Sequence, residues 1–261
     1  MYRESADSVD IIFVYADALK SVSFLGYNVC DESYDRILEY LRYSVFFGEK
    51  HVLIAFNPKK VALASTDSDV QKALIEADLL IPDGFGIILA SNLMGTKIKH
   101  RVTGTDTVWR ICGDSKLSKA GMFIYGAEPD SLKDAVERLT KNGVVISGAE
   151  NGYDSDEDKV ISLINESKAK ILLVALGSPK QELFIHKNKE KLEHVKLVMG
   201  VGGTIDVISG HVKRAPAPIR KLGLEWVFRM ICQPSRINEN KSNISKYIKI
   251  IMRERRKKSG N

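Results

Sequence analysis

The chain has 261 residues, of which 44% are hydrophobic, and this is enough to bury the core of one large α/β domain, alone or with an appendage. Its net charge of +6 lies in the tail, because the residues from Lys241 onward carry eight Lys and Arg against one Glu. A body close to neutrality with a cationic end indicates a local anionic partner, either membrane lipid or nucleic acid.

Targeting and metal-binding patterns are missing from the sequence. No N-terminal stretch combines a basic start, an apolar core and a small-residue cleavage site, and no apolar run is long enough to span a bilayer. The cysteines Cys30, Cys112 and Cys232 are far apart and odd in number, which argues against a disulfide framework or a zinc site. We therefore expect reduced thiols in a protein of the cytosol or of a membrane face.

The first clear elements are a helix, a strand and a second helix. Residues 33–47 have apolar side chains at helical spacing and end at Gly48, which predicts an amphipathic helix. Residues 51–56 form a short apolar run typical of a buried strand, which leads into Asn57. We predict that residues 61–77 form the helix that crosses back.

A carboxylate stands at the tip of the next strand. Residues 79–82 read as a strand that ends at Asp83. In that position Asp83 is well placed to act as a base or to hold a sugar hydroxyl. The simpler alternative is that Asp83 caps the helix predicted over residues 87–93.

A basic loop then brings in Arg101. This side chain could pair with a phosphate or with Asp83 itself. Thr105 or Asp106 could cap the helix that continues through residues 109–112.

Further strands complete an alternating pattern. Residues 121–126 and 144–147 read as strands, and a helix is expected to begin at residues 127–129. Because strands alternate with helices from residue 52 to residue 201, we predict an α/β protein with a doubly wound, mostly parallel sheet.

Two pairs of aspartates have the spacing of metal ligands. Asp67 and Asp69 lie within the predicted helix, where a solvated face is the better interpretation. Asp154 and Asp156 precede a helix start, where carboxylates interact favourably with the helix dipole. We interpret the second pair as capping residues and predict no metal site.

Two strand ends open into glycine. Residues 171–176 predict a strand buried on both faces, followed by Ser178 as N-cap, Pro179 at the first helical position and Gln181 in a capping box. Such a junction can bind an anion, although a well-capped turn explains it equally well.

The second glycine-opened strand covers residues 197–201. It leads into Gly202 and Gly203, where backbone can approach a phosphate closely. The dinucleotide fingerprint fails, because Ile205 stands where its third glycine should come. The two junctions together suggest a nucleotide-type pocket without identifying the nucleotide.

The C-terminal quarter changes character. Gly210 should close a short helix, and His211 is expected on the surface. Pro216 and Pro218 argue against regular structure, and a last core helix is predicted over residues 222–232. A basic amphipathic helix follows, with apolar side chains at the spacing i, i+3, i+4 and i+7, namely Ile244, Tyr247, Ile248 and Ile251.

Seven motifs, taken in order, resemble one family. They are IPDGFGIILASNLMG, RVTGTD, GAEP, ENGY, LGSPKQE, GVGGTIDVISG and KRAPAPIRKLGLEWVFRM, spread over about residues 50–236. The set resembles the bacterial WecG/TagA/CpsF glycosyltransferases, glycosyltransferase family 26. This resemblance implies a Rossmann-like sheet with a basic C-terminal helical appendage, divided into a catalytic domain at 1–236 and a tail at 237–261.

The resemblance also implies the reaction and its partners. Family members transfer N-acetylmannosamine or another hexose from a UDP-sugar to a polyprenyl-pyrophosphate-linked sugar on the cytoplasmic face of the bacterial plasma membrane. The transfer is expected to be inverting and to need no metal or cofactor. The expected partners are the donor, the lipid-linked acceptor and an anionic membrane surface, with no nucleic acid and a possible homo-oligomer.

Roles for individual residues follow from the resemblance. Asp83 would be the general base, and Asn57, Arg101 and Gln181 would orient sugar or phosphate. The weaker candidates for the nucleotide are Gly126, Ala127, Gly202, Gly203 and Asp206. The cations that would contact the membrane are Lys246, Lys249, Arg253, Arg255 and Arg256.

The chain departs from the family pattern at Ala55, where many relatives carry a threonine two residues before the asparagine. The change bears on the identity of the acceptor or the donor, and it makes a sugar other than N-acetylmannosamine more plausible. Two alternatives to this reading remain: a non-catalytic nucleotide-sugar-binding or nucleic-acid-binding protein, and a tail that serves oligomerisation.

Overall fold

The computed structural model describes residues 19–153, 156–221, 225, 227–228 and 237–259. The predicted helix over residues 222–232 falls almost entirely outside the described residues. Asp154 and Cys232 also lie outside them.

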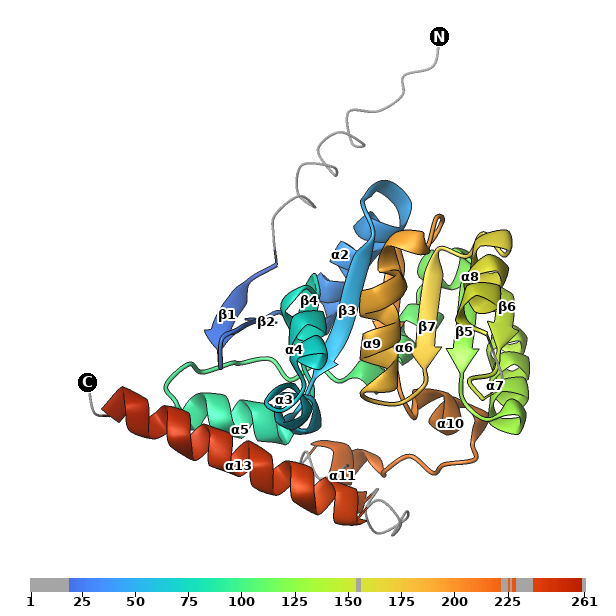
Figure 1. Cartoon of the computed structure of the whole chain (residues 1–261). Helices are drawn as coiled ribbons and strands as arrows, with labels where there is room; N and C mark the ends of the chain where they lie inside the picture. The colour runs from blue at the N-terminus through green and yellow to red at the C-terminus, as the bar shows by residue number, and fades with distance from the viewer. Residues whose placement is uncertain (1–18, 154–155, 222–224, 226, 229–236, 260–261) are drawn as a thin grey trace.

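A single sheet of eight strands forms the centre of the described part of the chain (Figure 1). The strand order is β1-β2-β4-β3-β8-β7-β5-β6, and every neighbouring pair except β1 with β2 is parallel. The predicted mostly parallel α/β fold is therefore confirmed. The strands are β1 Ser21–Phe24, β2 Tyr27–Cys30, β3 His51–Phe56, β4 Leu79–Pro82, β5 Met122–Gly126, β6 Ile146–Glu150, β7 Ile171–Ala175 and β8 Leu197–Gly200.

Helices cover both faces of the sheet (Figure 1). The helices are α2 Tyr34–Phe47, α3 Pro58–Ala64, α4 Ser68–Ile75, α5 Phe85–Leu93, α6 Gly104–Gly113, η1 Leu117–Lys119, α7 Pro129–Lys141, α8 Glu157–Glu166, α9 Lys180–Asn188, η2 Lys189–Lys191, α10 Thr204–Ser209, α11 Ala217–Lys221 and α13 Ile237–Ser259. Strand side chains alternate between the two faces, so Ile54 belongs to the core cluster that also holds residues of α3, α4, α5, α8, α9 and α13. Leu53 belongs to the cluster that holds residues of α2, α6, α7 and α10.

Buried thiols and an apolar helix face fit the expectations. Ser33 accepts a hydrogen bond from the backbone of α2, and Gly48 ends that helix. Cys30 and Cys112 are free and buried, and burial raises the pKa of each thiol to about 12. Both observations agree with the sequence-based reading of these segments.

The predicted helix over residues 61–77 is wrong in its extent. The chain forms α3, which begins at Pro58, and then α4, which begins at Ser68. The break falls at Asp67, whose carboxylate accepts hydrogen bonds from the N–H groups of Asp69 and Val70. Asp67 is thus an N-cap, because a short carboxylate competes for backbone donors that a continuous helix would use.

Three further elements correct the predictions. The β1–β2 hairpin was not predicted. Its turn places Leu25 and Gly26 at positive φ. Strand β6 begins later than predicted, at Ile146. Pro218 lies inside the short helix α11, since a proline in the first helical turn removes no intrahelical hydrogen bond.

The tail folds back onto the body of the protein. Helix α13 lies beside α3 and α5, and its Tyr247 and Ile251 are buried in the same core cluster as α3 (Figure 1). The Tyr247 hydroxyl donates to the carbonyl oxygen of Gly86, at 3.0 Å. None of the helices in the described part of the chain combines the length and apolar character needed to cross a bilayer.

Candidate functional site

The carboxyl ends of the parallel strands meet at one edge of the sheet (Figure 1). Predicted site residues follow these strand ends: Asn57 after β3, Asp83 after β4, Ala127 after β5 and Gly202 shortly after β8. Open α/β sheets bind their ligands outside this edge, so the fold gathers the predicted residues where a ligand is expected.

Asp83 is half-buried between the end of β3 and the beginning of α6. Its N–H donates to the carbonyl oxygen of Phe56, at 2.8 Å. A β-carbon built on Gly104, the first residue of α6, would lie 3.9 Å from the Oδ2 atom of Asp83 and 3.1 Å from the Cβ atom of Ala55. The carboxylate is therefore close to a helix N-terminus, where the helix dipole favours negative charge.

Asp83 is not the N-cap residue of the helix that follows it. The N-cap of α5 is Gly84, at φ 91°. The cap predicted for α6 is also wrong. Thr103 takes that position, and its Oγ1 atom accepts from the N–H of Asp106, at 3.2 Å.

Two arginines of the C-terminal segment form ion pairs with Asp106. Arg214 forms a hydrogen-bonded ion pair with its Oδ1 atom, and the Nη1 atom of Arg220 lies 3.6 Å from the same oxygen. Burial raises the pKa of Asp106, but hydrogen bonds from Arg214 and Thr103 and the charges of both arginines outweigh it and hold the pKa below its ordinary value. Asp106 is therefore an anchor for the segment that carries these arginines.

Arg101 belongs to the same cluster. Its Nη2 atom donates to the carbonyl oxygen of Arg220, at 2.9 Å, so the loop before α6 is tied to α11. The side chain is half-buried at the sheet edge that carries Asp83. Its expected pairing with a phosphate stays a prediction.

Gln181 does not form the predicted capping box. Helix α9 begins at Lys180, and the Oγ atom of Ser178 donates to the Oε1 atom of Glu182, at 3.1 Å, instead of capping. The Gln181 side chain is buried. Its Nε2 atom donates to Glu182 at 2.7 Å, and its Oε1 atom accepts from the N–H of Gly202 at 2.9 Å. Gln181 therefore fixes the turn after β8.

A buried ion pair supports this arrangement. The Nζ atom of Lys60 lies 3.2 Å from the Oε1 atom of Glu182 and donates to the carbonyl oxygen of Ala55, at 2.9 Å. The backbone N–H of Lys60 donates to the Oδ1 atom of Asn57, at 3.1 Å. Contacts thus run without interruption from Asn57 through Lys60 and Glu182 to Gln181.

The turn after β8 leads into α10. Gly203 is its N-cap, and the Oγ1 atom of Thr204 lies 3.0 Å from the Oγ1 atom of Thr105 on α6. This hydroxyl pair joins the two helix starts. Gly202 and Gly203 are consequently brought next to the part of the site that contains Asp83.

Gly126 and Ala127 lie at the end of β5. A β-carbon on Gly126, where φ is +109°, would lie 2.6 Å from the carbonyl carbon of Ala175, so only glycine fits there. The N–H of Ala127 donates to the carbonyl oxygen of Ala175, at 3.1 Å. This donor is therefore engaged within the protein, and close strand packing explains the glycine without a nucleotide.

Asp206 lies near an aromatic side chain that the sequence-based reasoning left out of the site. The hydroxyl of Tyr153 donates to the Oε1 atom of Glu128, at 3.4 Å. Burial and the nearby charges of Glu128 and Asp206 raise the pKa of that hydroxyl. Tyr153 follows the glycine in the motif ENGY, which is the one sequence feature that could have drawn attention to it.

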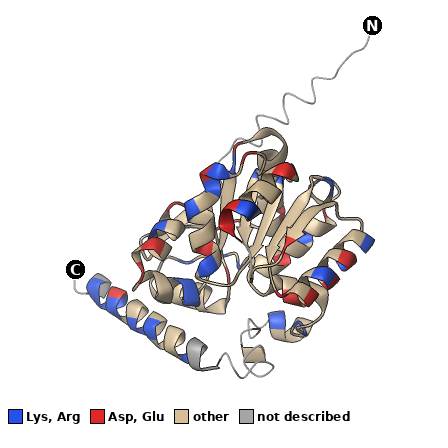
Figure 2. Ribbon diagram, turned by 45° about the vertical axis from the view of Figure 1, so that its right-hand side comes forward, with Lys and Arg blue, Asp and Glu red and all other residues tan. Residues whose placement is uncertain are grey.

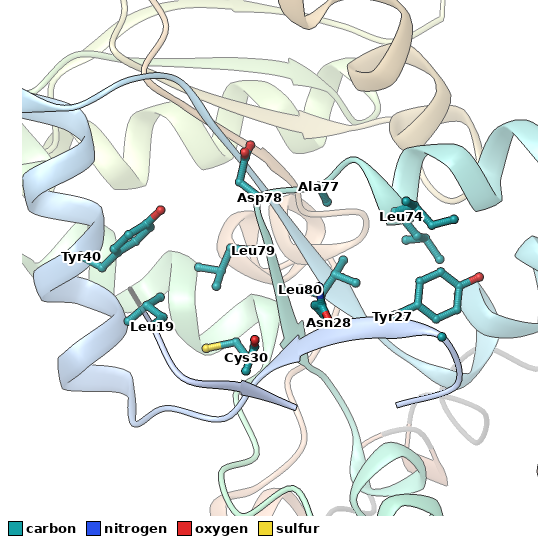
Figure 3. Close-up of a pocket in the computed structure, with 13 residues that line it drawn as sticks. Leu19, Tyr27, Asn28, Cys30, Tyr40, Leu74, Ala77, Asp78, Leu79 and Leu80 are labelled. Atoms are coloured by element: carbon teal, nitrogen blue, oxygen red, sulfur yellow. The ribbon is translucent and has the colours of Figure 1, made fainter. Parts of the chain in front are cut away.

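None of the predicted site residues lines the cavity of about 320 Å³ that Figure 3 shows. It lies beside β2 and β4, with Tyr40 and Leu74 on opposite sides, and Asp78 at the amino end of β4. The Oδ2 atom of Asp78 accepts from the N–H of Val52, so this carboxylate holds two strand starts together. The cavity is remote from the carboxyl edge and carries none of the predicted roles.

Lys and Arg positions recur along the ribbon of α13 (Figure 2). The five cations expected to contact a membrane are all exposed: Lys246, Lys249, Arg253, Arg255 and Arg256. His211 is exposed as expected and pairs with Asp134 at 2.8 Å. Among the described residues, no three His, Cys, Asp or Glu side chains are gathered as a metal site.

Comparisons with known proteins point to one family. The model of the glycosyl transferase WecG/TagA/CpsF family matches residues 22–261. A Bacillus spizizenii protein named N-acetylglucosaminyldiphosphoundecaprenol N-acetyl-beta-D-mannosaminyltransferase is 32% identical over 206 residues, which are 78% of this chain and 79% of the relative. The Bacillus subtilis protein of the same name is 34% identical over 209 residues, which are 79% of this chain and 81% of the relative.

Proposed function

The chain belongs to the WecG/TagA/CpsF family of glycosyltransferases, and from that premise we propose that it transfers N-acetylmannosamine from UDP to a polyprenyl-pyrophosphate-linked N-acetylglucosamine. The observation that carries the proposal is the position of Asp83, half-buried at a strand tip between Asn57 and the N-terminus of α6. The names of the two relatives support N-acetylmannosamine as the transferred sugar and a lipid-linked N-acetylglucosamine as the acceptor.

The reaction is a single displacement with inversion. An acceptor hydroxyl attacks the anomeric carbon of the donor sugar while Asp83 takes the hydroxyl proton. The bond from that carbon to the diphosphate breaks, and its electron pair leaves with UDP. A positioned base of this kind contributes about 10²–10⁴-fold to the rate.

The other predicted residues bind and orient the substrates. Asn57 and Arg101 contact the donor sugar or its diphosphate, and no metal ion is needed for the charge. Gln181 acts by fixing the turn at Gly202. The nucleotide extends from the end of β5 to the start of α10, past the remaining candidates, Gly126, Ala127, Gly203 and Asp206.

The tail brings the enzyme to its acceptor. The five exposed cations of α13 attract an anionic membrane surface, where each Lys or Arg contributes about 1 kcal/mol. We place the enzyme on the inner face of the bacterial plasma membrane, with residues 1–236 as the catalytic domain and residues 237–261 as the tail.

The test is transfer from a panel of UDP-sugars to a short-chain lipid-pyrophosphate N-acetylglucosamine, read by mass, with and without added magnesium. The panel contains UDP-N-acetylmannosamine, UDP-glucose and UDP-galactose. Transfer of N-acetylmannosamine without added metal supports the proposal in full. A product of hexose mass would keep the reaction and reassign the donor, with Ala55 as the first residue to exchange for threonine.

A further inference from the structure

Helix α5 has an exposed apolar row. Phe85, Leu89 and Leu93 are 44%, 48% and 51% exposed, and their spacing of four residues places them on one side of the helix. The opposite side is buried through Ile87 and Ala90. Helix α5 therefore has two apolar faces, and only one of them is covered by the rest of the protein.

The row borders the contact between α5 and α13. The Tyr247 hydroxyl of α13 bonds the carbonyl oxygen of Gly86, and Leu89 and Leu93 lie three and seven residues beyond Gly86, on the same side of α5. Helix α13 carries two exposed apolar side chains of its own, Ile248 at 54% and Met252 at 49%. The two helices lie side by side (Figure 1).

Cations lie beside the apolar side chains of α13 and in the loop that follows α5. On α13, Ile248 and Met252 line a shallow hollow together with Lys249, Arg253 and Arg256. The loop that follows α5 adds the exposed side chains of Lys97 and Lys99. The blue segments of the α13 ribbon in Figure 2 mark its Lys and Arg residues.

We propose that the α5 row, Phe85, Leu89 and Leu93, enters the apolar layer of an anionic membrane beside α13. An apolar centre with a basic rim matches such a surface, since the side chains leave water while the cations reach the lipid headgroups. A second copy of the chain fits poorly, because a symmetric contact would bring the same cations face to face.

The consequence for catalysis rests on the proposed transfer to a lipid-linked sugar. Helix α5 begins two residues after Asp83, so its insertion holds the proposed base close to the membrane surface. The acceptor sugar is attached to a lipid through a diphosphate and is therefore presented at the same depth.

The experiment measures sedimentation of the full chain with vesicles of phosphatidylglycerol and phosphatidylcholine in equal parts. The test variant is Leu89→Gln with Leu93→Gln, which removes apolar surface and keeps good helix formers. The matched control is Phe47→Gln with Ile75→Gln, where side chains 76% and 60% exposed lie on α2 and α4. Circular dichroism checks that both variants fold.

We expect the test variant to bind these vesicles about tenfold or more weakly, because the two leucines lose part of their transfer free energy, and the control to bind as the unchanged chain does. Transfer to a short-chain acceptor in solution should be unchanged, whereas transfer to an acceptor embedded in the vesicles should fall.

Unchanged vesicle binding by the test variant overturns the inference, as does a dimer of the unchanged chain that the variant dissociates in the absence of vesicles. The proposed function is judged separately. It fails if the unchanged chain transfers no sugar to the soluble acceptor, whatever the vesicles show.

Discussion

The Nζ atom of Lys60 lies 3.2 Å from the Oε1 atom of Glu182, and the two side chains are 4% and 0% exposed. The same carboxylate oxygen accepts from Ser178 and Gln181, which ties the pair to the turn at Gly202. A buried salt bridge fixes the positions of its two side chains more than it adds net stability, because both charges have lost their hydration. Its proposed role is to hold the carboxyl edge of the sheet in one arrangement.

Replacing one partner of this pair should be costly. We expect Lys60→Met to lower the free energy of unfolding by about 3–5 kcal/mol, since Glu182 would stay buried without its counter-ion. Urea denaturation measures the change. The control is Lys72→Met, whose pair with Asp69 is exposed and should contribute at most about 1 kcal/mol. Equal losses in the two variants would contradict the role given to burial.

The proposed base is tested by Asp83→Asn. The amide keeps the size of the side chain and removes its ability to take a proton, so kcat should fall about 10²–10⁴-fold while UDP binding is retained. Calorimetric titration with UDP and the transfer assay measure the two effects. Asp69→Asn, at an exposed position, is the control. Full activity of Asp83→Asn would remove this residue from the mechanism.

The cluster around Asp106 predicts a dependence of stability on pH. Because the pKa of Asp106 is lowered in the folded protein, its stabilising effect is complete above the unfolded pKa of about 4 and is lost as the pH falls through the lower, folded value. The difference in unfolding free energy between the unchanged chain and Asp106→Asn should therefore be constant from pH 7 to pH 5 and shrink below about pH 4. A difference that grows towards acid would refute the assignment.

Gly126 should tolerate no side chain. In Gly126→Ala the strained backbone costs about 1–3 kcal/mol, and the contact with the carbonyl carbon of Ala175 adds to this. Gly26→Ala separates the two effects, since φ there is +82° and nothing lies within 4 Å of the added carbon. Thermal unfolding should show a clearly larger loss for Gly126→Ala. Matching losses would mean that the strand ends can move apart.

The strands and their order along the chain could be predicted because each is a short apolar run bounded by turn residues. Strand β7 and helix α2 lie where their patterns place them. Helix boundaries that depend on the hydrogen bond of one side chain were harder to predict. Ser178 was predicted as an N-cap that accepts from the backbone, whereas in the fold its hydroxyl donates to Glu182.

Residues that act through distant partners left no local pattern. Lys60 looks like any lysine on a helix, and its burial against Glu182 depends on β3 and β7 lying on either side of β8 in the sheet. Arg214 and Arg220 are separated from Asp106 by more than a third of the chain, so their pairing could not be read from spacing. The position of Asp83 at a strand tip, by contrast, could be predicted from the residues next to it in the sequence.

The bond from Tyr247 to Gly86 joins residues 161 positions apart and has a consequence for synthesis. A nascent chain folds from its N-terminus, so the sheet can form while α13 is still inside the ribosome. The surfaces of α3 and α5 beside α13 are then open to solvent, because α13 follows every strand of the described sheet in the order of synthesis. Chaperones that recognise apolar helices would meet this protein at α5, in the interval before its tail arrives.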